Sequence, residues 1–152
     1  MTLVLRPARS TDAGKLGAMI SQAVAAHTWK PKLHTGAEDI AHMGELIARG
    51  WVTVCELKGE VAGFLALAPP VIQSLYVKSD AQGLGVGTRL LRKAMASQKA
   101  LELWTFEANK GSQRFYLRHG FVECERTDGS GNEEGLPDIR YQWVKPAQEN
   151  KN

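Results

Sequence analysis

The chain has 152 residues, of which 43% are hydrophobic and 23% are charged, and its formal net charge is +3. This length and composition are typical of one globular domain with a substantial core. The sequence holds no apolar run of roughly eighteen residues that would span a membrane, and its first residues lack the apolar core of a signal peptide. We therefore expect a cytoplasmic protein without a membrane partner.

The polar composition excludes further classes of protein. Basic residues are scattered rather than gathered in a stripe with aromatic side chains, so a nucleic-acid partner is not indicated. Cys55 and Cys124 lie in strand-like runs without the spacing of metal ligands, and no metal site is expected. We expect both thiols to be buried and unreactive in a reducing compartment, with a catalytic cysteine or a disulfide as less favoured alternatives.

The chain begins with a strand and a helix. Residues 3–7 predict a short strand that stops at a proline. Residues 13–26 place apolar side chains at helical spacing. Three residues before this segment are candidate N-caps of the helix: Ser10, Thr11 and Asp12.

A loop over 27–35 precedes the second predicted helix. Thr35 and Glu38 form the sequence of a capping box, which marks the start of a helix, and Gly50 marks its end. The next two β-rich runs, 51–57 and 61–68, are separated by a three-residue loop and predict a hairpin.

A glycine-rich turn then joins a strand over 71–77 to a helix, and its sequence is Gln82-Gly83-Leu84-Gly85-Val86-Gly87-Thr88. Backbone N–H groups at such a helix start are unpaired and attract a phosphate or pyrophosphate. The P-loop lysine is missing after Gly87, and the glycines do not have the Rossmann spacing G-x-G-x-x-G. A turn that binds no ligand is the alternative.

The remaining residues predict three strands and one helix. A strand over 101–108 has Leu103 and Trp104 as its apolar centre, and a helix over 111–119 ends at Gly120. A strand over 121–125 and an acidic, glycine-rich loop over 127–137 precede the last strand, over 139–144.

The order of these elements is β-α-α-β-β-β-α-β-α-β-β. It predicts an α/β fold, in the sense of an α+β mixed sheet, with about four helices flanking the sheet. No repeat or linker divides the chain. We expect a single domain over residues 1–145 and a frayed tail over 146–152.

Two segments resemble a known family. The residues Gln82 to Gly87 resemble the Q/R-x-x-G-x-G/A signature of the GNAT superfamily of acyl-CoA-dependent N-acetyltransferases. Downstream, Asn109 and the run Phe115-Tyr116-Leu117-Arg118-His119-Gly120-Phe121 resemble the second conserved segment of that family. The resemblance covers nearly the whole chain and implies a GNAT-like fold with acetyl-CoA as co-substrate.

The resemblance also implies site residues. Tyr116 matches the general acid that protonates the leaving thiolate, and packing of its helix on the sheet is the alternative role. For Asn109, a cofactor contact and a turn at the end of a strand are equally open. The positions that match cofactor-binding residues are Leu75, Tyr76, Val77, Gln82, Gly83, Leu84, Gly85, Val86, Gly87, Thr88 and Asn109.

The expected activity is transfer of an acetyl group from acetyl-CoA to a primary amine of a small molecule or peptide, directly in a ternary complex. Many relatives carry a glutamate as general base where this chain has Val71 and Trp104, so the base is unassigned. This gap motivates the alternative of an acyl-CoA-binding sensor with little or no catalysis, and a nucleotide-binding module is a weaker third possibility. A homodimer is a family-level expectation, and the acceptor is not predicted.

Overall fold

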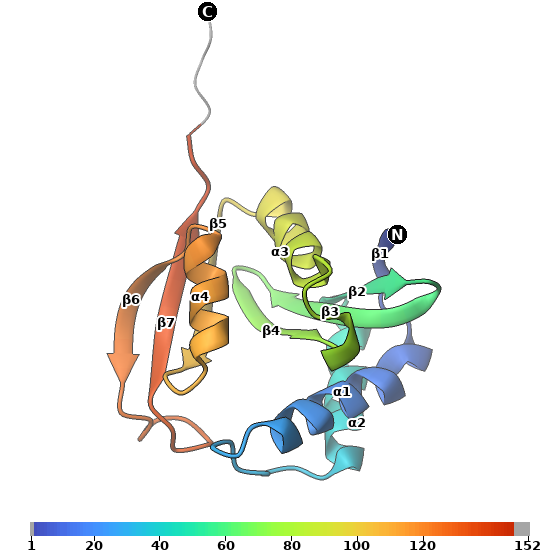
Figure 1. Ribbon diagram of the computed structural model, residues 1–152, viewed down its shortest axis with the longest axis horizontal. Helices are drawn as coiled ribbons and strands as arrows, with labels where there is room; N and C mark the ends of the chain where they lie inside the picture. Colours follow the sequence, from blue (N-terminus) through green and yellow to red (C-terminus); the bar gives the residue numbers. More distant parts are fainter. Residues whose placement is uncertain (1, 148–152) are drawn as a thin grey trace, which may run out of the picture. The chain divides into compact units, whose positions relative to one another are not determined.

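The computed structural model describes residues 2–147 (Figure 1). Residues 148–152 of the expected tail lie outside the described part of the chain. The strands and helices, in chain order, are β1 Leu3–Pro7, α1 Ala13–Ala26, α2 Gly36–Ala48, β2 Val52–Leu57, β3 Glu60–Ala68, β4 Val71–Val77, α3 Val86–Ser97, β5 Ala100–Phe106, α4 Lys110–Arg118, β6 Val122–Thr127 and β7 Asp138–Val144. Two single-turn 3₁₀ helices, η1 Ser10–Asp12 and η2 Ser79–Ala81, precede α1 and the glycine turn.

The strands form a seven-stranded sheet in the order β1-β2-β3-β4-β5-β7-β6. The pairing of β4 with β5 is parallel, whereas β1–β2, β2–β3, β5–β7 and β6–β7 are antiparallel. The predicted mixed sheet with four α-helices is confirmed. By its internal contacts the chain divides into two compact units. The first unit holds residues 2–68 and 72–94, and the second holds 69–71 and 95–147.

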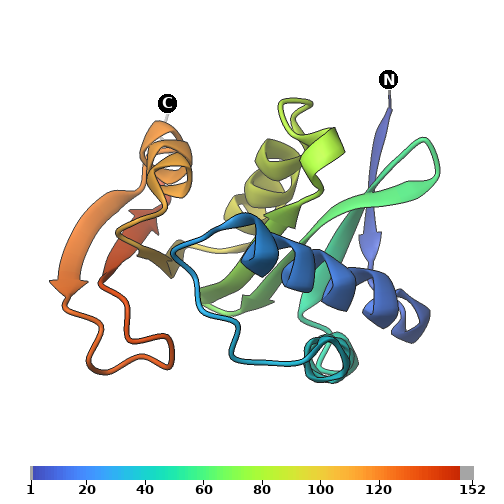
Figure 2. The same cartoon turned by 60° about the horizontal axis from the view of Figure 1, so that its bottom comes forward.

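Helices α1 and α2 pack closely in the first unit, and Figure 2 shows α2 end-on beside α1. The close packing depends on Gly17, because a Cβ at this residue would lie 2.7 Å from the Cα of Ile40. The buried Asp39 of α2 accepts a hydrogen bond of 2.7 Å from the hydroxyl of Ser21 in α1. The core beneath is made of apolar residues from both helices and from β2 and β3: Leu16, Met19, Met43, Leu46, Val52, Val54, Val61, Phe64 and Ala66.

Helix α2 has the ends that the sequence predicts. The Thr35 hydroxyl accepts from the N–H of Glu38, and the Glu38 carboxylate accepts from the N–H of Thr35. At the other end Gly50 has φ +75°, and the N–H groups of Gly50 and Trp51 donate to the carbonyls of Ile47 and Leu46. These two bonds form a Schellman motif, in which a left-handed residue satisfies the last carbonyls of a helix.

Helix α1 begins at the predicted residue, Ala13, but without a side-chain cap. None of the three candidate N-caps bonds its side chain to the first amides of α1, and Ser10 to Asp12 form η1 instead. The carboxylate of Asp12 instead accepts from the N–H of Arg9, between β1 and η1, at 2.7 Å. Of the three candidates, Asp12 is the N-cap residue of α1, but its side chain makes no capping hydrogen bond because the carboxylate has a stronger, charged partner in Arg6.

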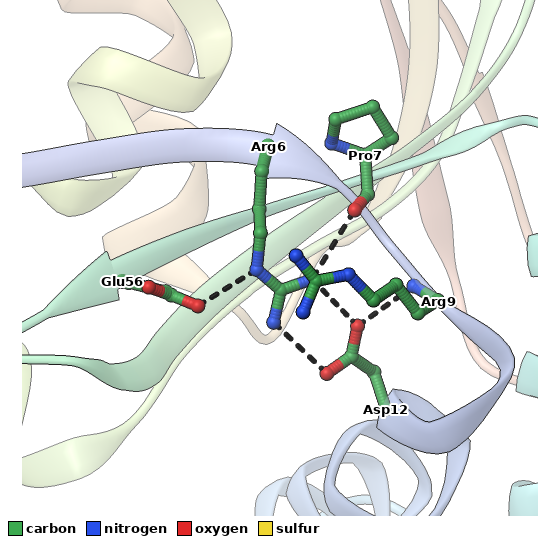
Figure 3. A network of polar contacts seen from close by, with 5 residues as sticks. All are labelled: Arg6, Pro7, Arg9, Asp12 and Glu56. Carbon is green, nitrogen blue, oxygen red and sulfur yellow. Dashed lines mark hydrogen bonds and ion pairs between the residues drawn. The ribbon is translucent and has the colours of Figure 1, made fainter.

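Arg6 of β1 joins three elements of the first unit through its guanidinium (Figure 3). Its Nη1 and Nη2 donate to the two carboxylate oxygens of Asp12 at 2.8 and 3.0 Å, and its Nε donates to Glu56 of β2 at 2.7 Å. The hydrogen bond from Arg6 lowers the pKa of Asp12, although burial opposes that shift. The network fixes β1, η1 and β2 to one another.

Two smaller predictions in this region need correction. The hairpin between β2 and β3 has two loop residues rather than three, because Leu57 pairs with Glu60. Lys58 and Gly59 both have positive φ, +55° and +79°, as a type I′ turn requires. Cys55 is buried and burial raises the pKa of its thiol, but Cys124 is exposed because β6 lies at the edge of the sheet. The prediction of a buried Cys124 was therefore wrong.

In the second unit, Gln113 of α4 donates to the carbonyls of Phe106 and Glu107 at the end of β5. Strand β5 ends at Phe106 rather than at residue 108, because Glu107 and Ala108 form the turn that leads into α4. Leu103 is buried as predicted, but Trp104 is 45% exposed, since it lies on the opposite face of the strand. Within residues 2–147, no helix is both long and apolar enough to cross a membrane.

Candidate functional site

The glycine turn lies in the first unit, between β4 and α3, and is exposed from Gln82 to Gly85. Gly83 and Gly85 have φ values of +79° and +86°, which L side chains rarely adopt. A Cβ at either glycine would meet no heavy atom within 4 Å. The glycines are therefore required by the backbone conformation, and the space above the turn is open to a ligand.

Helix α3 starts directly from this turn. The N–H of Arg89 donates to the carbonyl of Gly85 at 3.0 Å, which places Gly85 just before the first helical residue. The amides of Val86 and Gly87 belong to the first turn, where N–H groups have no acceptor within the helix. The side chain of Val86 is 1% exposed and anchors the helix start in the core. These amides and the helix dipole favour an anion at the turn.

Gly63 in β3 supports the turn, and the sequence alone did not single it out. A Cβ at Gly63 would lie 2.7 Å from the carbonyl oxygen of Tyr76 and 2.8 Å from Cγ1 of Val86. Only a glycine there lets the end of β4 and the start of α3 both approach β3. The ring of Tyr76 stacks on Phe64, with centroids 5.4 Å apart, so this side chain is held by the core.

Strand β4 carries the other matched residues of this unit. Leu75, Tyr76 and Val77 are half-buried at the end of the strand, directly before η2 and the turn. The hydroxyl oxygen of Ser74 is buried and has no hydrogen-bond partner within residues 2–147. The ten matched positions of the first unit thus lie at the end of β4 (75–77) and in the glycine turn with the first residues of α3 (82–88), and residues 78–81 connect the two stretches.

Tyr116 lies in the second unit, on α4, and is 6% exposed. Its ring makes edge contacts with Phe115 and Phe121, with centroids 5.2 and 5.4 Å away. Gly120 has φ +90°, and the N–H of Phe121 donates to the carbonyl of Tyr116 at 3.1 Å. This is a second Schellman motif, and its apolar contact is the Tyr116–Phe121 pair. Packing and helix termination together hold Tyr116 in one position.

Asn109 is the N-cap of α4, and its Oδ1 accepts from the N–H of Ser112 at 3.1 Å. Gln113 reinforces this end of the helix by donating from Nε2 to the carbonyls of Phe106 and Glu107. The structure therefore gives Asn109 the local role that the sequence left open. A cofactor contact by this residue stays a prediction.

The structure does not supply an obvious general base at the positions considered. Val71 pairs with Glu102, and the carboxylate of Glu102 accepts from Nη1 of Arg140 at 3.1 Å. Glu107 lies 3.8 Å from Nη1 of Arg126. Within residues 2–147 no three His, Cys, Asp or Glu side chains form a group that could hold a metal ion.

The second unit contains a pocket of about 590 Å³ beside Trp104. Strand ends and the loop over 128–137 supply its lining: Trp104, Thr105, Phe106, Thr127, Ser130, Gly131, Asn132, Glu134 and Asp138. The acidic composition of the loop was visible in the sequence. The place of Trp104 in the pocket was not visible in the sequence, because the strand pattern predicts a core residue until the face of β5 that carries Trp104 is known.

Comparison with known proteins identifies the family. Residues 48–123, half of the chain, match the acetyltransferase (GNAT) domain. The chain belongs to the GNAT family of acetyltransferases, as the sequence resemblance predicted.

Individual relatives agree with this assignment. An uncharacterised N-acetyltransferase of Methanocaldococcus jannaschii is 34% identical over 92 residues, which cover 50% of this chain and only 41% of that protein. The peptidyl-lysine N-acetyltransferase YjaB of Escherichia coli is 27% identical over 130 residues, 84% of this chain and 88% of that protein. The structure of yncA from Salmonella typhimurium with its cofactor acetyl-CoA superposes with a TM-score of 0.76 at 19% identity, covering 100% of this chain and 99% of that chain. This last likeness shows the shared fold.

Proposed function

We propose that this protein is an acetyl-CoA-dependent N-acetyltransferase, with residues 1–145 as one catalytic domain. It transfers the acetyl group to a primary amine of a small molecule or peptide, directly in a ternary complex. The observation that carries the proposal is the exposed turn with positive φ at Gly83 and Gly85, at the start of α3 and inside the matched family segment. That yncA is described with acetyl-CoA as its cofactor supports the choice of co-substrate.

The segment 75–88 has the chemistry that coenzyme A requires. The open turn and the amides of the first turn of α3 suit a pyrophosphate, which needs N–H donors and close backbone approach. We infer that the end of β4, Leu75 to Val77, offers backbone groups to the amide-rich pantetheine arm. The unpartnered hydroxyl of Ser74 is a further polar group available on this strand.

Tyr116 is the proposed general acid. The neutral amine nitrogen attacks the thioester carbonyl carbon, a C–N bond forms and the C–S bond breaks. The departing thiolate takes the phenolic proton of Tyr116. The proton lost by the amine passes to solvent, since no base is assigned, and the Tyr116 phenolate regains a proton from solvent before the next turnover. A phenol with an ordinary pKa near roughly 10 is protonated at neutral pH and can supply that proton.

The proposal is tested by thiol release from acetyl-CoA with a panel of amines. We expect Tyr116→Phe to lower kcat by about 10²- to 10⁴-fold while coenzyme A still binds. Tyr141→Phe is the matched control, because Tyr141 is 2% exposed in β7 of the same unit and has no proposed role. Binding of coenzyme A without turnover of any amine would instead favour the acyl-CoA sensor. Thermal stabilisation by a nucleotide but not by coenzyme A would favour the nucleotide-binding module.

The role of the glycine turn in binding coenzyme A is tested by two alanine substitutions with equal backbone strain. Gly85→Ala and Gly59→Ala both place a side chain at positive φ, +86° and +79°, with open space around it. We expect both variants to lose a similar stability, about 1 kcal/mol. Only Gly85→Ala should weaken coenzyme A binding in a calorimetric titration. Equal affinity in the two variants would contradict the proposed role of the turn.

A further inference from the structure

Helix α4 carries a row of positive charges on its exposed side. Lys110, Arg114 and Arg118 are exposed and lie four residues apart, so they follow one side of the helix over about 12 Å. Leu117, which is 53% exposed, lies on the same side. The proposed catalytic function uses none of these four side chains, which together form the basic face of α4.

The described part of the chain does not neutralise this basic face. Within residues 2–147 no ion pair joins Lys110, Arg114 or Arg118 to a carboxylate, and α4 itself contains no acidic residue. The guanidinium of Arg118 lies 5.9 Å from the ring centroid of Phe115, a contact that leaves its charge uncompensated. Cations four residues apart on a helix repel one another, and Lys110 lies at the positive end of the helix dipole. A negative partner would therefore stabilise this helix.

The connection between β6 and β7 carries the opposite charge. Residues 128–138, here called the acidic loop, contain four carboxylates and no lysine or arginine: Asp128, Glu133, Glu134 and Asp138. Asp128 and Glu133 are exposed. The acidic loop and α4 belong to the same unit, and in both Figure 1 and Figure 2 the loop lies below the helix. The second unit thus presents a basic and an acidic surface at separate places.

The acidic loop is held in shape by its own contacts. Asn132 donates from Nδ2 to the carbonyl of Leu136 at 2.7 Å and accepts from its N–H at 3.2 Å. Gly129, with φ +86°, packs so closely that a Cβ would lie 2.4 Å from the carbonyl carbon of Leu136. Because the loop is already ordered, a protein partner loses little affinity to ordering it.

We propose that a second copy of this chain binds both surfaces, with the basic face of α4 in each copy against the acidic loop of the other. A two-fold axis makes this arrangement self-complementary, because each copy then supplies one basic and one acidic surface to two identical contacts. Three cations meet four carboxylates in each contact, and the exposed Leu117 adds apolar area. An unrelated acidic partner would use only the basic face and leave the acidic loop without a role. The inference goes beyond the proposed acetyltransferase function and does not rest on it.

Self-association of the wild type, measured by sedimentation equilibrium, is the first test. We expect a monomer–dimer equilibrium whose Kd is at least about tenfold weaker at about 1 M salt than at about 0.1 M, because the Debye length falls from about 10 Å to about 3 Å. A chain that stays monomeric up to about 1 mM, or a dimer insensitive to salt, would overturn the proposal. Binding of heparin to such a monomer, lost in Arg114→Glu, would instead assign the basic face to a different acidic partner.

An exchange of charges tests which surfaces meet. One variant carries Arg114→Glu and Arg118→Glu, and the other carries Glu133→Lys and Glu134→Lys. In a dimer of either variant alone, both contacts bring like charges together, so we expect Kd to rise at least about 100-fold. An equimolar mixture of the two should recover the dimer, because one contact is then native and the other has both of its charges exchanged. If the folded variants stay monomeric when mixed, the two surfaces do not pair.

A matched control separates these surfaces from net charge. Arg92→Glu with Lys93→Glu changes the net charge by the same amount as the α4 variant, at exposed residues of α3 that belong to neither surface. We expect this control to dimerise like the wild type, and an equal loss of the dimer would overturn the proposed interface. Circular dichroism shows whether each variant is folded. Lys110→Glu and Asp128→Lys repeat the exchange at other exposed residues of the same two surfaces if one of the first variants does not fold.

Discussion

The close contact between α1 and α2 can be tested with two substitutions in one helix. Gly17→Ala adds a Cβ that would lie 2.6 Å from Cγ1, 2.7 Å from Cα and 2.8 Å from N of Ile40. Two of these three atoms are backbone, so a change of rotamer cannot relieve the overlap. Gly14→Ala adds the same methyl group to the same helix, where nothing lies within 4 Å.

The expected magnitude follows from two opposing effects. Replacing glycine by alanine inside a helix stabilises it by up to about 1 kcal/mol. Overpacking a close contact costs about 1–3 kcal/mol. Since both variants gain helix propensity, the difference between their stabilities isolates the overlap. We expect Gly17→Ala to be about 1–3 kcal/mol less stable than Gly14→Ala.

Urea unfolding followed by circular dichroism at 25 °C measures this difference, with equal m-values for the two variants as the check that both unfold alike. For a chain of this size the same difference should separate the melting temperatures by several degrees, since about 1 kcal/mol shifts Tm by about 2–4 °C. If Gly17→Ala proves as stable as Gly14→Ala, the two helices do not approach each other as closely as the structure shows.

Three further predictions concern charge, thiol access and the pocket loop. Arg6 lowers the pKa of Asp12 in the folded state. The contribution of this ion pair to folding stability is therefore full above the unfolded pKa of Asp12, near roughly 3.9, and is lost as pH falls through the lower folded pKa. The free energy of unfolding, measured against pH in acid, should show this loss in the wild type and not in Asp12→Asn. In the native protein a thiol reagent should label the exposed Cys124 rapidly and the buried Cys55 only after unfolding, and fast labelling of both would be inconsistent with the core. Gly129→Ala should be less stable than Gly131→Ala by about 1–3 kcal/mol in urea unfolding, because only the first substitution meets the backbone of Leu136.

Local sequence signals predicted most of the elements. The capping box at Thr35 and the terminating glycines at Gly50 and Gly120 are read from a few adjacent residues, and each has the expected geometry. The failures share a cause in tertiary structure. Asp12, one of three candidate caps, is the N-cap residue of α1, but its carboxylate binds Arg6 of β1 instead of the first amides of the helix. Cys124 was expected to be buried, but β6 is the edge strand, which the order of strands in sequence does not reveal.

The glycine turn and the pocket also differ in how far the sequence predicts them. The glycine turn is a continuous segment whose conformation depends on its own residues, so the sequence predicts an exposed glycine turn at a helix start, as the structure shows. Anion binding at this turn stays a prediction. The pocket in the second unit depends on β5, β6, β7 and their connecting loop, and on which face of β5 carries Trp104. Gly63 shows that the glycine turn also depends on tertiary structure. In the sequence it is an ordinary strand glycine, but in the structure only a glycine there leaves room for the carbonyl of Tyr76 and the side chain of Val86. Replacing Gly63 should therefore weaken the binding of coenzyme A at the glycine turn without changing any residue of the turn's sequence motif.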